Sequence, residues 1–245
     1  MCGVMDRIVL RVSGDDRAKF LHGLVTRDVP ETGLGYAALL SPQGKYLADF
    51  LTFADADALY LDVAAGMAEG LARRLMMYRL RSKVEIGDAG MAVSRGTGEA
   101  PEGAMTDPRP GMGWRHYGGA PGDTTDWDAA RVDNLVPETG IELIPDESYI
   151  LEMGFERLGG VDFRKGCYVG QEVTARMKHK TELRKGLARV RGDGLVRGTA
   201  ITSQDRAAGT IHTVSGDRAL AYLRFDRAEG MEADGLPLTL DRPAP

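Results

Sequence analysis

The sequence has 245 residues, of which 43% are hydrophobic and 27% are charged, and its formal net charge is −5. This length permits one large domain or two modest ones, with enough apolar residues to form a core. The negative charge argues against nonspecific binding of the whole chain to nucleic acid or to a membrane surface. No apolar run approaches the roughly 20 residues of a membrane span, and no signal peptide is recognisable.

The chain contains two cysteines, Cys2 and Cys167. A disulfide framework, and with it secretion, is therefore not expected. Two thiols this far apart in the sequence cannot form a four-cysteine zinc or cluster site within one chain. These features predict a cytoplasmic enzyme or binding protein, and we expect it to be a monomer.

The first third of the chain alternates predicted strands and helices. Apolar patterns predict strands over residues 7–12, 36–40, 46–53 and 58–63. Ser13 and Asp16 fit a capping box, with Ser13 as the N-cap of a helix that carries Phe20, Leu21, Leu24 and Val25 on one face. A second helix is expected over residues 65–78, where apolar residues recur at a spacing of three or four.

The middle of the chain gives weaker patterns. Residues 94–123 are rich in glycine and proline and predict an irregular segment. Thr125 is expected to cap a short helix that includes Trp127 and Ala130. A further helix is predicted over residues 149–158 and would end at the glycine pair that follows it.

From Lys185 to Leu240 the pattern changes to short β-prone runs separated by glycines. The runs cover residues 187–190, 199–202, 210–214 and 219–223. Several short strands with turn signals between them predict a small antiparallel barrel.

One stretch, Lys165-Gly166-Cys167-Tyr168-Val169-Gly170-Gln171-Glu172, concentrates chemically useful groups. A free thiol has a pKa of about 8.5, and a neighbouring lysine or arginine lowers it. Glycines let a ligand approach the main chain closely. An aromatic face, an amide and a carboxylate suit a polar heteroaromatic ligand better than a bare metal ion.

This stretch, with Leu158-Gly159-Gly160-Val161-Asp162-Phe163 before it, resembles the signature of the YgfZ family. These folate-binding proteins are related to the T-protein of the glycine cleavage system, an aminomethyltransferase, and are tied to the maintenance of iron–sulfur proteins. Residues 20–29, 78–84 and 131–145 are similar to further blocks of these families. His22, inside the first block, is by itself expected to be a surface or core histidine rather than a ligand.

The resemblance implies an α+β, aminomethyltransferase-like, three-lobed folate-binding fold that ends in a small antiparallel β-barrel. It would place the folate-binding region in residues 1–180 and the barrel domain in residues 181–245. It also implies tetrahydrofolate or a derivative as the ligand, and client iron–sulfur proteins as partners.

The resemblance further suggests roles for the motif. Lys165 and Arg164 would polarise the site and hold Cys167, the reactive group, partly as a thiolate. Tyr168 would pack or stack, and Gln171 and Glu172 would hydrogen-bond within the site or to the pterin edge. Two residues outside the motif, Asp49 and Arg176, complete the predicted folate site.

A basic run after the motif includes Arg176, Lys178, His179, Lys180, Arg184 and Lys185, opposed nearby only by Glu182. Such a run is usually a solvated face. It could also attract the glutamyl tail of a folate or an RNA backbone. The folate tail is favoured over RNA because no aromatic side chains are interleaved with the charges.

Three other functions can be set against this one. A working aminomethyltransferase would use an adjacent pair of aspartates on its second hairpin strand, and this chain has Ala48-Asp49 there, which leaves the enzyme activity open. A noncatalytic RNA-binding or assembly factor would use the basic run. A metal-dependent hydrolase is disfavoured, because four scattered histidines without an HExxH or CxxC motif provide no ligand set.

Overall fold

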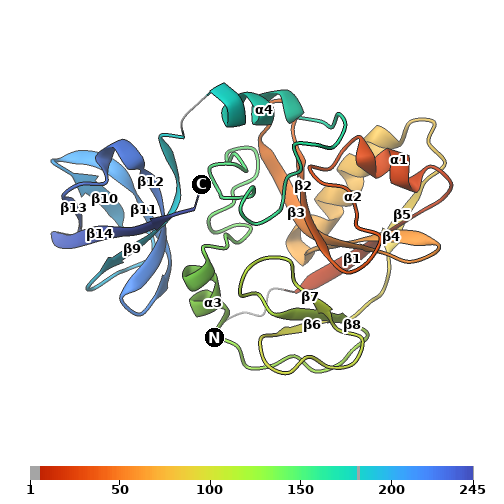
Figure 1. Cartoon of the computed structure of the whole chain (residues 1–245), viewed down its shortest axis with the longest axis horizontal. Coiled ribbons are helices and arrows are strands. Elements are labelled where there is room, and N and C mark those ends of the chain that lie inside the picture. Colours follow the sequence, from red (N-terminus) through yellow and green to blue (C-terminus); the bar gives the residue numbers. More distant parts are fainter. Residues whose placement is uncertain (1–5, 181–182, 245) are drawn as a thin grey trace.

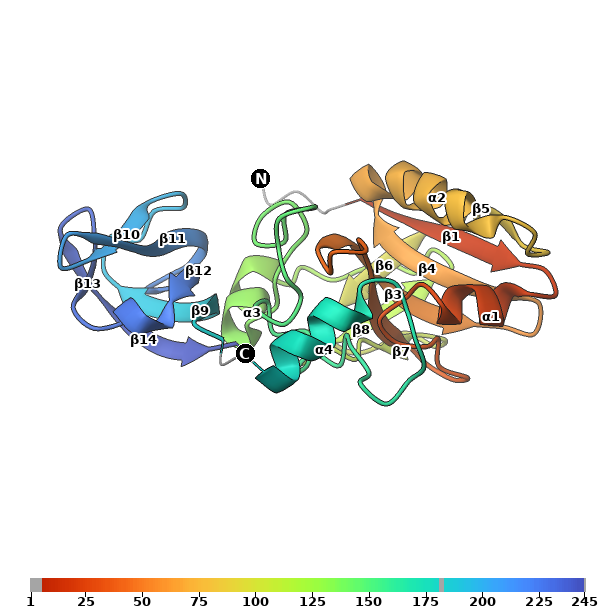
Figure 2. The same cartoon turned by 90° about the horizontal axis from the view of Figure 1, so that it is seen from above.

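The fold was obtained as a computed structural model, which describes residues 6–180 and 183–244. It consists of an N-terminal sheet with two helices, a small second sheet beside it, and a C-terminal barrel at the opposite end (Figures 1 and 2). Cys2 and Glu182 lie outside the described residues. No helix in the described ranges has both the length and the apolar character needed to cross a membrane.

The N-terminal sheet has five antiparallel strands in the order β2-β3-β4-β1-β5. The strands are β1 (Arg7–Ser13), β2 (Gly35–Leu40), β3 (Tyr46–Ala54), β4 (Ala58–Ala64) and β5 (Glu85–Asp88). Every residue of β2 is buried, because both faces of the sheet are covered. The four strands predicted for this region are confirmed.

Two helices cover one face of this sheet. They are α1 (Arg17–His22) and α2 (Ala65–Arg79), and Phe20, Leu21, Leu71 and Leu75 pack against Leu61 and Val63 of β4. The predicted helix over residues 65–78 is confirmed. The predicted capping box is wrong: Ser13 ends β1, the N-cap is Asp16, and the Asp16 carboxylate accepts a hydrogen bond from the Lys83 amide instead of capping α1.

The prediction of an irregular segment over residues 94–123 holds for most of its length, but three short strands in this region form a second sheet that was not predicted. This sheet has three antiparallel strands in the order β6-β8-β7, namely β6 (Val93–Gly96), β7 (Met105–Thr106) and β8 (Trp114–Tyr117). Tyr117 packs on Phe53 of β3, with ring centroids 4.4 Å apart. Strands of two to four residues are too short to show a readable alternation, so their pairing is fixed by packing on the larger sheet.

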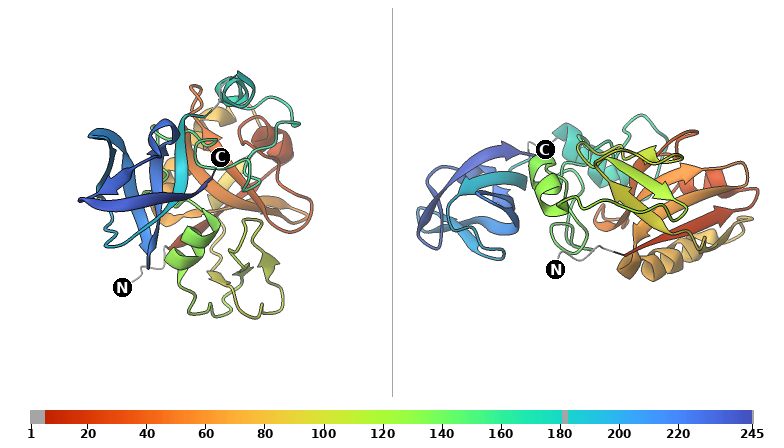
Figure 3. Two further views of the ribbon diagram at one scale, coloured as in Figure 1. Left: turned by 60° about the vertical axis from the view of Figure 1, so that its left-hand side comes forward. Right: turned by 90° about the horizontal axis from the view of Figure 1, so that it is seen from below.

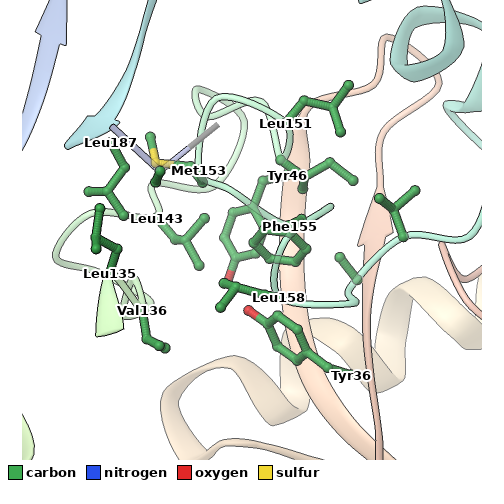
Figure 4. Close-up of a cluster of buried hydrophobic side chains, with 14 of the residues drawn as sticks. Tyr36, Tyr46, Leu135, Val136, Leu143, Leu151, Met153, Phe155, Leu158 and Leu187 are labelled. Carbon is green, nitrogen blue, oxygen red and sulfur yellow. The ribbon is translucent and has the colours of Figure 1, made fainter. Parts of the chain in front are cut away.

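The segment 149–158 is wound into successive turns, and the helix predicted there is wrong. Gly154 adopts a φ of +76°, which a continuous right-handed helix does not allow. Its apolar residues still enter the central core, where Phe155 lies against Tyr36 with ring centroids 4.9 Å apart (Figure 4). A row of buried turns and a helix therefore give the same apolar spacing in the sequence.

The short helix predicted after Thr125 is confirmed as α3 (Trp127–Asn134), but its N-cap is Asp126, whose side chain accepts a hydrogen bond from the Ala129 amide. Thr125 instead donates to Asp123. A last helix, α4 (Gln171–Lys180), starts within the motif and leads toward the barrel (Figure 1).

The C-terminal part is a closed barrel of six strands in the order β10-β11-β12-β9-β14-β13. They are β9 (Lys185–Gly192), β10 (Ala200–Ser203), β11 (Arg206–Ser215), β12 (Arg218–Arg224), β13 (Met231–Ala233) and β14 (Leu236–Pro243), with a short 3-10 helix, η1 (Phe225–Arg227), between β12 and β13. The barrel has its own apolar core and lies against α3 (Figure 3). The predicted antiparallel barrel is confirmed.

Candidate functional site

The motif lies in a loop that is tied to the segment following α1. The Thr26 hydroxyl donates to the Gly160 carbonyl at 2.6 Å, and the Asp162 amide donates to the Thr26 carbonyl at 3.0 Å. Further along, the Val169 amide donates to the Gly23 carbonyl at 3.2 Å. The fold thus brings together two sequence blocks that are about 140 residues apart.

Lys165 fastens this loop to the end of α1. Its ammonium group donates to the carbonyls of His22 at 2.8 Å and Val25 at 2.6 Å, and lies 3.2 Å from an Asp28 oxygen. Only 1% of its side chain is exposed. Burial lowers the pKa of Lys165, while the Asp28 carboxylate opposes that shift. All three ammonium hydrogens have acceptors, so Lys165 holds the loop in place and has no hydrogen left for a ligand.

Cys167 is an exposed free thiol. The neighbouring Gly166 lies against His22: a Cβ placed on Gly166 would be 2.8 Å from the His22 Nε2 atom. The other ring nitrogen of His22 is 2.9 Å from Asp28. The loop therefore presents the thiol to solvent over a polar support made of His22, Asp28 and Lys165.

Gly170 allows the chain to turn from this loop into α4. It adopts a φ of +84°, and a Cβ at this position would lie 2.6 Å from the Ser41 carbonyl oxygen and 2.9 Å from the Leu40 Cβ. Only glycine fits this close approach to the end of β2. Glu172 then falls in the first turn of α4, where a negative charge complements the helix dipole.

The other motif residues do not converge on one cavity with Cys167. Tyr168 is buried in the central core, with Lys165 above its ring at 5.2 Å, and burial raises the pKa of Tyr168 to about 12. Arg164, Glu172 and Arg176 are exposed, and Gln171 is partly buried. The basic run is partly neutralised, since Lys178 pairs with Glu156 at 2.6 Å and Lys185 lies 3.9 Å from Glu152.

Asp49 lies on β3 within a group of hydroxyls. One of its oxygens accepts hydrogen bonds from Tyr46 at 2.8 Å and Thr139 at 2.6 Å, and the other accepts from Tyr36 at 2.9 Å. Figure 4 shows the Tyr36 and Tyr46 rings beside Phe155 and Leu158. A carboxylate has about four acceptor positions, so one remains for a ligand and two-point recognition of a pterin edge does not fit this arrangement.

Ala48 points away from Asp49, because successive side chains of a strand face opposite sides of the sheet. It is buried among Leu21, Leu61 and other residues under α1 and α2. The alanine at this position therefore removes no polar group from the side of the sheet on which Asp49 lies.

A cavity that the sequence did not indicate lies between the two sheets and α3. Its volume is about 500 Å³, and its walls include Arg7, Arg95, Arg115 and Trp127. The Arg95 guanidinium stacks on the Trp127 ring at 3.9 Å. The cavity thus combines several cations with the flat guanidinium of Arg95, which covers the largely buried Trp127 ring, and we call it the arginine cavity.

A buried ion network includes Arg7 and Arg115, two of the residues that line the arginine cavity. Asp62 pairs with Arg7 at 2.6 Å and with Arg115 at 3.1 Å, and Asp107 pairs with Arg109 at 2.7 Å and with Arg115 at 3.2 Å. Three guanidinium groups therefore share two buried carboxylates, so the network has a formal charge of +1 although each guanidinium has at least one carboxylate partner.

Arg95 adds a further positive charge to the cavity. Within the described ranges, no carboxylate lies at ion-pair distance from it. Burial lowers the pKa of Arg95 to about 10, and the nearby charge of Arg115 acts in the same direction. Asp6 and Asp123 also line the cavity, but the Asp123 oxygens already accept from Thr97, Gly98 and Thr125. The cavity is suited to an anion that carries a flat ring.

Sequence reasoning missed these residues because they come from four separate segments. Arg7 begins a strand that was predicted for its apolar residues, and Arg95 and Arg115 lie in the region predicted to be irregular. One sequence signal could have found them. Arg95 and Arg115 each lie inside a short β-prone run, where burying a charge without a partner would be costly.

Fold and site together define a protein with an aminomethyltransferase-like fold, an arginine-lined cavity and a surface thiol. The structure resembles the glycine cleavage system aminomethyltransferase T from Bartonella henselae, with a TM-score of 0.79 and 12% identity, over 97% of this chain and 83% of that one. At this identity the likeness concerns the fold. Residues 184–245 match the family described as the CAF17 C-terminal β-barrel domain.

The iron–sulfur cluster assembly factor IBA57 of Homo sapiens is 30% identical over 91% of this chain and 77% of its own length. The homologue from Phaeosphaeria nodorum is 33% identical over 76% of this chain, which spans about half, 53%, of that relative. This chain therefore belongs to the IBA57 family. The membership agrees with the resemblance to the YgfZ family inferred from the motif.

The expectation of a cytoplasmic protein is contradicted, because these relatives are named as mitochondrial proteins. The prediction rested on few cysteines and on the lack of a recognisable signal peptide or membrane span, and these features do not distinguish one compartment inside the cell from another.

Proposed function

We propose that this protein supports the assembly or repair of iron–sulfur proteins, with Cys167 as the group that contacts the client protein or its cluster. The observation that carries the proposal is the exposed thiol on a loop held by Lys165. The relatives named as iron–sulfur cluster assembly factors support the same role.

One thiolate cannot hold an iron–sulfur cluster, which commonly needs four cysteine ligands. Among the described residues, no group of three or more histidine, cysteine and acidic side chains is placed to bind a metal ion. A cluster handled by Cys167 would therefore be cargo that is shared with a client, and the client would supply the remaining ligands. An exposed position is required for this contact, and a buried cysteine would not serve.

We also propose that a reduced folate binds in the arginine cavity. The flat guanidinium of Arg95, supported by the Trp127 ring, suits a flat pterin or benzoyl ring, and its unpaired charge suits the glutamate carboxylates. The charge of Asp49 acts to raise the pKa of Arg7 and of Arg109, so Asp49 lies near the same region. Its hydrogen bonds with three hydroxyl groups leave one acceptor position for a ligand. A bound reduced folate would supply a one-carbon unit or reducing equivalents.

The folate proposal is tested by titrating the purified protein with tetrahydrofolate under anaerobic conditions. Arg95→Gln removes the unpaired charge and should weaken binding by about tenfold or more, whereas Arg95→Lys should keep part of the affinity. The matched control is Arg224→Gln, an exposed arginine of the barrel that pairs with Asp226. Equal affinity of Arg95→Gln and the unchanged protein would refute this cavity as the folate site.

The thiol proposal is tested in cells that lack the protein, by measuring the activities of their iron–sulfur enzymes. Cys167→Ser should leave the folded protein and its melting temperature unchanged, because the side chain is exposed, and should not restore the enzyme activities. Full restoration by Cys167→Ser would remove the thiol from the mechanism.

A further inference from the structure

An open groove of about 850 Å³ lies between α1 and the C-terminal end of α2. These two helices are at the end of the molecule remote from the barrel (Figures 1 and 2). We call it the α1–α2 groove, and its walls are formed by Asp16, Lys19, Phe20, Leu24, Tyr78, Leu80, Arg81 and Ser82. Four of these eight residues are large and apolar, so the groove has an apolar lining next to solvent.

Leu80 stands at the rim of this groove in an unfavourable conformation. It follows the last residue of α2 with a φ of +44° and a ψ of −107°, and 87% of the residue is exposed. A positive φ after a helix is normally occupied by glycine or asparagine. A leucine here bears both backbone strain and exposure of its side chain. Strain retained at one position supports a hypothesis of function at that position.

Two methionines extend the apolar surface. Met76 and Met77, in the last turns of α2, are 42% and 65% exposed. Methionine side chains are flexible and adapt to different partners. Neither methionine lines the groove, so the two add exposed apolar surface to the same end of α2.

The charges of the groove are mainly positive. Lys19 and Arg81 are exposed, and neither has a carboxylate at ion-pair distance within residues 6–180 and 183–244. The carboxylate of Asp16 accepts a hydrogen bond from the Lys83 amide, so one of its oxygens already has a partner in the chain. A chain with a net charge of −5 thus carries a local positive groove with apolar walls.

We propose that the α1–α2 groove docks an acidic segment of a client protein, with leucine-like side chains on the groove floor and carboxylates on Lys19 and Arg81. The identification of this partner as a client protein rests on the assembly role proposed above. α1 forms one wall of the groove, and its last residue, His22, is bound by Lys165, two residues before Cys167. A client held in the groove would therefore be close to the loop that presents the thiol.

The proposal is tested by fluorescence anisotropy with a labelled helical peptide of leucine and glutamate, and with its counterpart in which lysine replaces every glutamate. The acidic peptide should bind and the basic one should not. Leu80→Gly and Arg81→Glu should each weaken binding by about tenfold or more. Leu80→Gly should also raise the melting temperature, because glycine relieves the strain. The control is Val196→Ala, an exposed apolar residue of the barrel region.

Four outcomes would overturn the proposal. The first is equal affinity for the two peptides, and the second is binding that Leu80→Gly leaves unchanged. The third is binding to phosphatidylserine vesicles in place of the acidic peptide, which would make the surface a membrane contact. The fourth is a dimer, seen by analytical ultracentrifugation, that Leu80→Gly dissociates. Peptide binding depends on neither folate nor Cys167, so its failure is distinct from a failure of the proposed function.

Discussion

Lys165 shows how a residue's role depends on the direction of its side chain. The sequence predicts that Lys165 polarises Cys167, because the two are close in the motif. In the structure the ammonium group turns to the end of α1, where His22, Val25 and Asp28 accept its hydrogens. The exposed cation nearest to the thiol along the chain is Arg164. The predicted electrostatic role for Lys165 thus becomes a positioning role in the proposal.

Asp107 gives a pH-dependent prediction at the same scale. Burial alone would raise the pKa of Asp107, but the charges and hydrogen bonds of Arg109 and Arg115 outweigh burial and lower the pKa to about 2. Its unfolded value is about 3.9. A depressed pKa in the folded state stabilises the protein above the unfolded pKa, and this stabilisation is lost as pH falls through the folded one. The free energy of unfolding should therefore fall between about pH 4 and pH 2.

The measurement is urea denaturation over this pH range. Asp107→Asn should lower the free energy of unfolding by about 3–5 kcal/mol at neutral pH, because it leaves Arg109 and Arg115 buried without that carboxylate. It should also reduce the slope below pH 4. Asp57→Asn, at an exposed loop position, is the control and should change neither. An unchanged acid slope in Asp107→Asn would contradict this role of the ion network.

At the scale of elements, the approach of α4 to the first sheet depends on Gly170. Its φ of +84° and its closeness to Ser41 and Leu40 join the end of β2 to the start of α4. In the same region, a Cβ placed on Gly44 would lie 2.8 Å from the Cβ of Val173 in α4, so the hairpin and α4 are in close contact. The conformation of the motif loop therefore depends on contacts with a hairpin that is far away in the sequence.

Gly170→Ala should be much more damaging than a comparable change elsewhere. Gly216 has a φ of +60° with no atom within 4 Å of the position that a methyl group would occupy, so Gly216→Ala costs only the strain of a positive φ, about 1–2 kcal/mol. Gly170→Ala adds a steric clash and should cost about 1–3 kcal/mol more. Chemical denaturation of both variants measures this difference, and equal losses would show that α4 can move away from β2.

At the scale of the whole molecule, a buried polar network connects the barrel to the rest of the chain. Glu142 accepts hydrogen bonds from Arg131 of α3 at 2.9 Å and from Thr213 of β11 at 2.6 Å. Arg131 also donates to Thr213 at 2.6 Å. Nearby, Tyr222 of β12 donates to Glu152 at 2.5 Å. These contacts, together with the α3–barrel packing in Figure 3, hold the barrel against the core.

Glu142→Gln keeps the shape of the side chain and removes its charge. We expect the free energy of unfolding to fall by about 1.5–3 kcal/mol, the contribution of a hydrogen bond to a charged group, because Arg131 still has Asp128 and Glu138 nearby. Hydrogen exchange should show faster opening of β11. Asp226→Asn, which alters an exposed pair within the barrel region, should leave both quantities unchanged. Unaltered exchange in β11 would mean that the network does not hold the barrel.

Much of the architecture could be predicted from the sequence alone. The strands near residues 7–12, 46–53 and 58–63, the helix over 65–78 and the terminal barrel follow from the spacing of apolar residues, which is a local property. The motif around Cys167 and the family resemblance were also readable, because short unbroken runs carry that signal. Cellular location could not be predicted, because compartments with similar chemistry favour similar amino-acid compositions.

The tertiary structure decided the rest. It showed that residues 149–158 form turns and that residues 94–123 contain a sheet, since both depend on packing against distant strands. It also gathered Arg7, Arg95, Arg115 and Trp127 into one cavity, and it placed the Lys165 ammonium against carbonyls at the end of α1. Local sequence determines which elements form, but the neighbours of a charged side chain come from remote segments, and only the folded chain brings them together.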